Sequence, residues 1–228
     1  MQTVSARSGI NQQLRLPLPA DLHAISVPAR KFTGDFFFSH RERETLWVTI
    51  GDVAGKGINA AVVMAMIQEE LERRIASCAR TDCDPAVTMR RLHELLRSVL
   101  APNRFATAVI AQIRDNGKLV VANAGHPPPL IARKNGTIER IGSTGPAAGI
   151  LDESRWTSVE KHLAPSETLL LYTDGAIEAN DFGVEGVAAA FRTAASHRSS
   201  RSVATAVANA VRAHGGIDDD LTLVVARR

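Results

Sequence analysis

The order of the expected helices and strands constrains the fold of this 228-residue chain more than any other feature. Hydrophobic periodicity and turn residues predict three strands, then two helices, a run of strands joined by short turns, two more helices and a final strand. Strands and helices do not alternate, which argues against the parallel sheet of a repeated βαβ fold. Two antiparallel sheets packed face to face, with a helix pair outside each, satisfy the order best. The sequence therefore predicts an α+β fold of four layers, an α-β-β-α sandwich.

Local signals give the bounds of these elements. Asp84 is expected to cap a helix that begins with Pro85, an arrangement that favours helix starts. The Asn-Gly pairs at 116–117 and 135–136 predict hairpins with type I′ turns, because Asn-Gly tolerates positive φ. The expected strands are residues 23–28, 35–40, 45–50, 105–114, 118–123, 130–133, 137–141, 158–163, 168–173 and 221–226. The expected helices are residues 58–76, 85–100, 184–195 and 201–214. The first of them is expected to share one face among Ala61, Met64, Ala65, Gln68, Leu71 and Ile75.

Length and composition bound the class of protein. A chain of this size buries one sizeable core, so we expect a single domain at residues 23–228 behind a short lead-in at residues 1–22. The net charge is only +3 and aromatic residues make up 4%, which argues against a nucleic-acid-binding surface. The N-terminal region lacks the apolar segment of a signal peptide, and the longest apolar run, residues 60–67, is too short to span a bilayer. We therefore expect a cytoplasmic protein that binds neither nucleic acid nor a membrane.

The two cysteines, Cys78 and Cys83, are separated by four residues and have no second pair nearby. This spacing matches neither a zinc ribbon nor a thioredoxin-type motif. We expect two buried or idle thiols, in line with a reducing cytoplasm.

Four aspartates stand where predicted strands begin or end. Asp52 closes an apolar run and is followed by VAGKG, while Asp35 lies within TGDFF at residues 33–37. Asp174 lies within LLYTDG at 170–175, and Asp219 lies within DDDLTLVV at 218–225. Because Mg²⁺ and Mn²⁺ favour anionic oxygen ligands, aspartates that recur at strand ends predict a site for divalent cations.

Five short motifs occur in the order found in a known family: GDF at 34–36, GDVAGKG at 51–57, NAGHPPP at 123–129, YTDG at 172–175 and DDLT at 219–222. Through them, residues 11–228 resemble the SpoIIE-type bacterial branch of the PPM (type 2C-like) serine/threonine protein phosphatases. The resemblance implies the α-β-β-α sandwich and two divalent cations, Mn²⁺ or Mg²⁺, at one end of the sheets. Many relatives have Gly-Gly before the first aspartate, where this chain has Thr33 and Gly34. The usual aromatic-Asp pair that follows is replaced by Phe37 and Phe38, and neither change removes a carboxylate ligand.

The resemblance also implies a role for each aspartate. Asp52 matches the residue that bridges both metals, with the backbone carbonyl of Val53 assisting at one of them. Asp174 and Asp219 match ligands of the other metal, and Asp35 matches a residue that reaches the second metal directly or through water. Two cations about 3.5–4 Å apart can share a water, lower its pKa and hold phosphate oxygens for in-line attack. Asp52, Asp174 and Asp219 are therefore the expected catalytic residues, acting through that metal-bound water.

The implied function is hydrolysis of phosphoserine or phosphothreonine on a small regulatory protein. In this branch the usual substrate is a phosphorylated anti-sigma-factor antagonist of a partner-switching pathway. The two helices at 58–76 and 85–100 can act in the family as a switch that assembles the metal site. We therefore expect weak metal affinity that improves with an upstream sensor or activator protein, or when the chain forms a homodimer. Most relatives carry an N-terminal sensor domain, for which this chain has too few residues ahead of Asp35.

Simpler interpretations compete with these. Any one aspartate beside a glycine is more often a turn residue. The sequence GKG at 55–57 suggests a phosphate-binding loop, but a Walker motif needs Ser or Thr after the Lys, so a nucleotide-binding switch is disfavoured. His126 is expected to be a hydrogen-bonded turn residue, His93 a residue at a helix surface or edge, and Asp220 a residue that orients its loop. The alternative to an enzyme is a catalytically weak regulatory binding module of the same fold.

Overall fold

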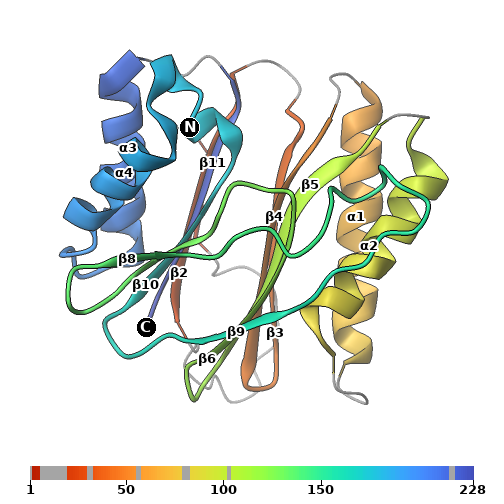
Figure 1. Cartoon of the computed structure of the whole chain (residues 1–228), viewed down its shortest axis with the longest axis horizontal. Helices are drawn as coiled ribbons and strands as arrows, with labels where there is room; N and C mark the ends of the chain where they lie inside the picture. The colour runs from red at the N-terminus through yellow and green to blue at the C-terminus, as the bar shows by residue number, and fades with distance from the viewer. Residues whose placement is uncertain are drawn as a thin grey trace.

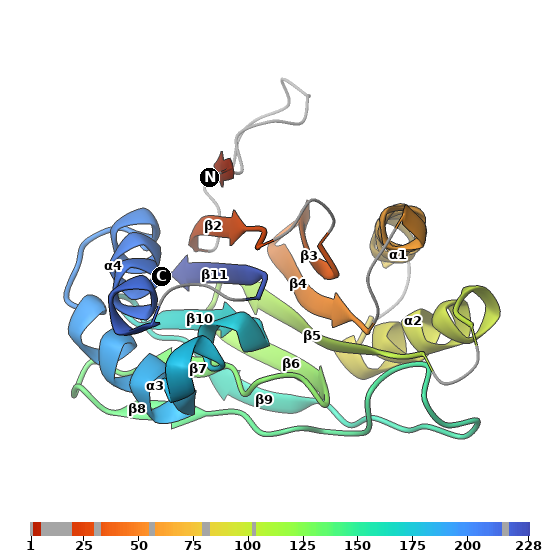
Figure 2. The same cartoon turned by 90° about the horizontal axis from the view of Figure 1, so that it is seen from above.

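The computed structural model describes residues 2–5, 20–29, 33–54, 58–78, 83–101, 104–215 and 219–228. In this part of the chain two antiparallel sheets lie face to face, with one pair of helices on the outer side of each (Figure 1). Seen from above, the two helix pairs lie at opposite ends of the layered stack (Figure 2). The four-layer α-β-β-α sandwich predicted from the order of elements is confirmed.

The first sheet contains strands from both ends of the chain, in the order β1-β2-β11-β10-β7-β8. Strand β1 was not expected: residues within the predicted lead-in pair with β2, so that Gln2 lies opposite Ser26. The bounds are β1 Gln2–Ser5, β2 Asp21–Val27, β7 Leu130–Ala132, β8 Ile138–Arg140, β10 Thr168–Tyr172 and β11 Leu221–Arg227. Because β10 and β11 are antiparallel neighbours, the end of β10 lies beside the start of β11.

The second sheet is a meander of strands in the order β3-β4-β5-β6-β9. Its bounds are β3 Asp35–Glu42, β4 Thr45–Val53, β5 Ala106–Arg114, β6 Lys118–Ala124 and β9 Val159–His162. Consecutive strands pair with each other from β3 to β6, which matches the short turns expected between them.

Alternation along the strands places the core in three layers. On β5, Ala108 and Ile110 face helices α1 and α2, whereas Val109 and Ala111 face the other sheet. Successive side chains of a strand point to opposite faces, so one apolar run serves both layers. A third apolar layer, which includes Phe191, lies between the first sheet and the other helix pair.

Helices α1 (Ile58–Ser77) and α2 (Pro85–Val99) cover the second sheet, and α3 (Gly183–Ala194) and α4 (Ser200–Gly215) cover the first (Figure 1). The predicted start of α2 is confirmed, since the Asp84 carboxylate accepts a hydrogen bond of 2.7 Å from the Ala86 backbone N–H. The predicted face of α1 is only partly right. Its buried residues recur every four positions, while Ala65 and Gln68 are exposed. The buried stripe is Val63, Ile67, Leu71 and Ile75. None of the described helices has the length and apolar character that crossing a lipid bilayer demands.

The two Asn-Gly hairpins form, but not through type I′ turns. Gly117 and Gly136 have φ of 87° and 82°, whereas neither preceding asparagine has positive φ. In each hairpin the glycine N–H donates to the carbonyl three residues earlier, with N···O distances of 2.8 and 2.9 Å. This is the three-residue hairpin loop, in which only the last position is left-handed and requires glycine.

The expectation of two free thiols is wrong, because Cys78 and Cys83 form a disulfide. Cys78 follows the last turn of α1 and Cys83 precedes the N-cap of α2. The Cα atoms of Cys78 and Cys83 lie 5.3 Å apart, within the range that a disulfide requires. A second correction concerns His93, which is buried and accepts a hydrogen bond from the Gly149 N–H at 3.0 Å. Its ring is tilted by 56° against that of Trp156, with ring centroids 5.3 Å apart.

Candidate metal centre

Two of the predicted aspartates face each other across neighbouring strands. Asp35 begins β3 and Asp52 lies one residue before the end of β4. In the antiparallel register these two residues are direct partners. Directly opposed residues of such a pair point to the same face of the sheet, so both carboxylates are held at one end of the second sheet.

The other aspartates come from the first sheet. Asp174 opens a short 3₁₀ helix, η1 (Asp174–Ala176), just after β10, and Asp219 precedes β11. The end of β10 and the start of β11 are adjacent, and Gly175 lies against the backbone of Asp219 and Asp220. A Cβ built on Gly175 would lie 2.2 Å from the carbonyl oxygen of Asp220, so only glycine is accommodated there.

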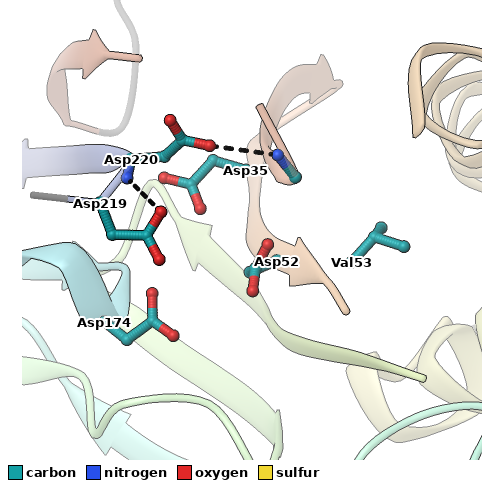
Figure 3. A pocket seen from close by; sticks show the side chains of 7 residues that line it. Asp35, Asp52, Val53, Asp174, Asp219 and Asp220 are labelled. Carbon is teal, nitrogen blue, oxygen red and sulfur yellow. Dashed lines mark hydrogen bonds between the residues drawn. The ribbon is translucent and has the colours of Figure 1, made fainter. Parts of the chain in front are cut away.

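The two sheets together form an acidic cleft of about 40 Å³. Its lining is Gly34, Asp35, Asp52, Val53, Asp174, Asp219 and Asp220 (Figure 3). One carboxylate oxygen from each of Asp35, Asp52 and Asp174 lies within 4.8 Å of the other two. Residues separated by more than a hundred positions therefore present hard oxygen donors to one small volume, which is the donor chemistry that Mg²⁺ and Mn²⁺ prefer.

The backbone at Gly34 brings two more features of the cleft together. A Cβ built on Gly34 would lie 2.4 Å from Oδ1 of Asp52 and 2.8 Å from the carbonyl oxygen of Val53. Both oxygens therefore lie close to the Gly34 Cα, in the space that a side chain would occupy at any other residue type. The Val53 N–H donates to the Gly34 carbonyl at 3.0 Å, which fixes this approach. The Val53 carbonyl is thus positioned beside the Asp52 carboxylate at the cleft.

Hydrogen bonds orient the buried Asp35. The Thr173 hydroxyl donates to Oδ2 of Asp35 at 2.8 Å and accepts from the backbone N–H of Thr222 at 2.9 Å. Thr173 lies between β10 and Asp174, and Thr222 lies on β11. The first sheet therefore fixes the orientation of a carboxylate that belongs to the second sheet.

Asp220 holds the backbone that leads into Asp35. Its Oδ1 accepts from the Ala29 N–H at 2.7 Å. Its Oδ2 accepts from the Gly34 N–H at 3.3 Å (Figure 3). With both oxygens engaged by backbone donors, Asp220 acts on the loop before β3. The sequence predicts that Asp220 orients its own loop, whereas its carboxylate accepts from a distant segment ahead of β3. Its neighbour Asp219 accepts from the Asp220 N–H at 2.9 Å through Oδ1.

Burial and like charges raise the pKa values of the cleft carboxyls. Burial, together with the charges of Asp52 and Asp220, raises the pKa of Asp35 to about 8, although its hydrogen bonds to threonine oppose the shift. Burial and the charge of Asp219 raise the pKa of Asp174 in the same way. A divalent cation would offset both causes, since it supplies positive charge where carboxylates converge out of water. The residues present therefore fit a metal site.

The structure brings all five predicted site residues, Asp35, Asp52, Val53, Asp174 and Asp219, into this one cleft. Thr173 was missed, although a hydroxyl directly before Asp174 in the YTDG motif was a usable signal. The backbone donors held by Asp220 were not readable from sequence, because they belong to a segment 186 or more residues away. The GKG segment at 55–57, including Lys56, lies outside the described residues, as does Asp218.

His126 is a buried turn residue, as expected. The side chain of Asn123 binds both backbone groups of His126, accepting from its N–H at 2.8 Å and donating to its carbonyl at 3.1 Å. Its Nδ1 lies 2.9 Å from the hydroxyl of Thr107, which is the β5 partner of Asp52. Burial lowers the pKa of His126 to about 3, so its ring is neutral in the folded protein. His126 thus supports the strand next to the cleft and does not line it.

Comparison with known proteins extends these observations. A family model described as stage II sporulation protein E (SpoIIE) matches residues 42–228. The chain is 29% identical over 160 residues to the phosphoserine phosphatase RsbU of Bacillus subtilis, a match that covers 69% of this chain and 47% of RsbU. The chain therefore spans about half the length of that curated relative.

Two solved structures share the fold. The crystal structure of the RsbU and RsbW domains of Rv1364c from Mycobacterium tuberculosis superimposes with a TM-score of 0.82 at 23% identity, over 92% of this chain and 60% of that one. The SiaA-PP2C domain of Pseudomonas aeruginosa superimposes with a TM-score of 0.77 at 21% identity, over 91% of this chain and 84% of that one. At these identities the likeness concerns the fold.

Proposed function

This chain belongs to the SpoIIE family, whose model matches its residues 42–228, and on that premise we propose that it is a metal-dependent protein serine/threonine phosphatase. The observation that carries the proposal is the convergence of Asp35, Asp52 and Asp174, whose carboxylate oxygens lie within 4.8 Å of one another. These residues come from two sheets, so the fold itself assembles the acidic cleft.

The proposed cofactor is a pair of divalent cations, Mn²⁺ or Mg²⁺. Asp52 would bridge them, with the Val53 carbonyl at one ion, Asp174 and Asp219 at the other, and Asp35 reaching the second ion directly or through water. When bound, such ions activate water for attack on phosphorus and neutralise the phosphate oxygens. Within the chain, Thr173 holds Asp35 in position, and Asp220 holds the backbone of Gly34 against Asp52 and Val53.

The size of the cleft supports a phosphoprotein as the substrate. Sites that enclose a whole small molecule are typically hollows of about 300–1,000 Å³. The acidic cleft measures about 40 Å³, so it can take ions and a phosphoryl group while the rest of a substrate stays outside. A phosphoserine or phosphothreonine presented by a protein surface satisfies this limit, because the rest of the substrate stays outside the cleft.

We further propose that the substrate is a phosphorylated anti-sigma-factor antagonist in a partner-switching pathway. Support comes from the similarity to a protein named phosphoserine phosphatase RsbU and from the structural likeness to a protein that carries RsbU and RsbW domains. In this proposal residues 23–228 form the phosphatase domain, which acts in the cytoplasm and responds to an upstream activator protein or to homodimerisation. Residues 2–5 join its first sheet as β1.

Hydrolysis of p-nitrophenyl phosphate and of a phosphoserine protein, each with and without added Mn²⁺, tests the proposal. Wild-type protein should turn over both substrates only with metal, and Asp52→Asn and Asp174→Asn should abolish turnover. Asp152→Asn is the matched control, because Asp152 is 85% exposed and pairs only with Arg97 among the salt bridges that the described residues show. Full activity in Asp52→Asn would refute the assigned mechanism. A folded wild-type protein that neither binds Mn²⁺ nor hydrolyses either substrate would favour the regulatory binding module instead.

A further inference from the structure

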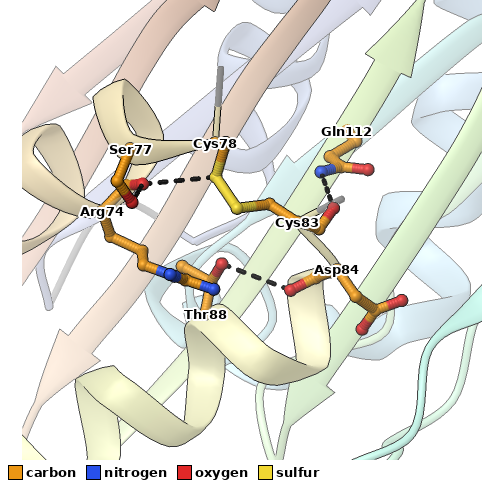
Figure 4. Close-up of a disulfide and its surroundings, with 7 residues drawn as sticks. All are labelled: Arg74, Ser77, Cys78, Cys83, Asp84, Thr88 and Gln112. Carbon is orange, nitrogen blue, oxygen red and sulfur yellow. Dashed lines mark hydrogen bonds between the residues drawn. A yellow bond between two sulfur atoms is a disulfide. The ribbon is translucent and has the colours of Figure 1, made fainter. Parts of the chain in front are cut away.

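The disulfide between Cys78 and Cys83 joins the end of one helix to the start of the next (Figure 4). Cys78 directly follows α1, and Cys83 directly precedes Asp84, the N-cap residue of α2. Both helices cover the second sheet, on which Asp35 and Asp52 lie. No part of the proposed phosphatase reaction uses these sulfur atoms.

The Cys83 side of the disulfide is firmly anchored. Gln112 of β5, which is buried, donates a hydrogen bond of 2.7 Å from its side-chain amide to the carbonyl of Cys83 (Figure 4). The next residue, Asp84, accepts a hydrogen bond of 2.6 Å from the Ser158 hydroxyl while it caps α2. The start of α2 is thus held to the second sheet independently of the sulfur bond.

The Cys78 side of the disulfide is more exposed than the Cys83 side. Cys78 is half-buried, whereas Cys83 is only 8% exposed. Sγ of Cys78 lies 3.2 Å from the carbonyl oxygen of Arg74, one helical turn earlier, so a reduced thiol would find a hydrogen-bond acceptor in place. The two sulfur-bearing residues also line a hollow of about 500 Å³ formed with the β3–β4 and β5–β6 turns. This hollow gives a small thiol a route to Cys78.

Helix α1 links this junction to the acidic cleft. Strand β4 ends at Val53 and α1 begins at Ile58, so the residues that supply Asp52 and the Val53 carbonyl lead almost directly into the helix. Twenty residues of α-helix extend about 30 Å, and the far end of α1 is the end that the disulfide holds. A helix is stiff along its axis. Its attachment at Cys78 therefore helps to set where its first turn lies.

We propose that Cys78 and Cys83 form a thiol–disulfide modification site that controls the attachment of α1 and, resting on the proposed function, the metal affinity of the cleft. A dithiol reductant attacks Sγ of Cys78 as a thiolate, the sulfur–sulfur bond breaks, and Cys83 leaves as a thiolate that takes up a proton. The second thiol of the reductant then resolves the mixed disulfide, which releases Cys78 as a thiol and the reductant as its own disulfide. Two electrons and two protons pass to the protein. The disulfide form holds α1 as seen in the structure, and the dithiol form frees its C-terminal end.

The test equilibrates the full chain in graded ratios of oxidised and reduced dithiothreitol, with thiol alkylation counted by mass spectrometry. We expect zero alkylated cysteines at the oxidised end, two at the reduced end, and full reversibility. Reduction should speed amide hydrogen exchange in the last turns of α1 and lower Tm by roughly 4–9 °C, as the loss of a short cross-linked loop predicts for a chain of this size. Calorimetry should show Mn²⁺ affinity weakened by about fivefold or more on reduction.

The double variant with Cys78→Ser and Cys83→Ser is the matched control, and its exchange rates, Tm and Mn²⁺ affinity should not respond to dithiothreitol. Two alkylated cysteines at every ratio, or a reversible disulfide whose reduction leaves exchange in α1 unchanged, would overturn the proposal. Faster exchange in α1 on reduction with unchanged Mn²⁺ affinity would overturn the link between the disulfide and the cleft. If Mn²⁺ bound in neither state, the proposed function would fail, while thiol counts and hydrogen exchange would still decide the redox site.

Discussion

Replacing Gly34 by alanine tests the geometry of the acidic cleft with a single methyl group. The added Cβ would lie 2.4 Å from Oδ1 of Asp52 and 2.8 Å from the Val53 carbonyl oxygen. Ordinary van der Waals contact begins at 3.4 Å, so the Asp52 oxygen must move by about 1 Å. Metal–ligand distances tolerate only about 0.2 Å, which makes this displacement several times larger than a site can absorb. We expect Mn²⁺ affinity to fall by roughly 10–100-fold.

Titration calorimetry with Mn²⁺ measures this loss directly, and Gly142→Ala is the matched control. A Cβ on Gly142 would meet nothing within 4 Å, and its φ is not in the left-handed range. The control should bind Mn²⁺ as the wild type does, and far-ultraviolet circular dichroism should show that both variants are folded. Wild-type Mn²⁺ affinity in folded Gly34→Ala would refute the placement of Asp52 and Val53 as ligands.

Three further predictions follow from the contacts around the cleft and from the core. Asp220→Ala removes the acceptor of two backbone N–H groups, at Ala29 and Gly34, so calorimetry should show Mn²⁺ affinity lowered by roughly 10–100-fold; unchanged affinity would refute its role as a positioning residue. Without metal, in the presence of a chelator, the pKa of Asp35 is raised from 3.8 to about 8 in the folded protein. The protonated carboxyl therefore stabilises the fold fully below pH 3.8, and this contribution is lost as the pH rises through about 8. Urea unfolding across this range should show the decline in wild type and its absence in Asp35→Asn, and parallel curves would contradict the assignment. Phe191→Ala should lower the free energy of unfolding by about 3–5 kcal/mol, because the ring is fully buried between α3 and the first sheet, and a loss well below this range would contradict that packing.

The fold could be predicted because periodicity and turn residues agree along most of the chain. Strand β5 contains the apolar run 108–111, which is typical of a strand buried on both faces, and α2 begins after the favoured Asp84 with Pro85 at its first position. Strand β1 could not be predicted because it forms through pairing with β2, and its four residues are too few to show a hydrophobic alternation. The face of α1 was misjudged for a related reason. Gln68 was expected to be internal from its spacing, but Val63 and Ile67 are the buried residues that join the apolar layer between these helices and the second sheet.

The acidic cleft was predictable residue by residue, but its supporting contacts were not. Motif order pointed to Asp35, Asp52, Asp174 and Asp219, and all of them line the cleft. The hydrogen bond from Thr173 to Asp35 joins residues 138 positions apart, so no local sequence pattern predicts it. The disulfide could not be predicted, because a spacing of four residues between two cysteines does not by itself indicate that they pair. Its formation depends on how the ends of α1 and α2 meet.

Crystals soaked in Mn²⁺ and measured near the manganese absorption edge test the central claim most directly. The account predicts two anomalous peaks in the acidic cleft, about 3.5–4 Å apart, with the Asp52 carboxylate touching both ions. The Val53 carbonyl should contact one ion, and Asp174 and Asp219 the other. A cleft without anomalous density at saturating Mn²⁺, or ions held without Asp52, would contradict it.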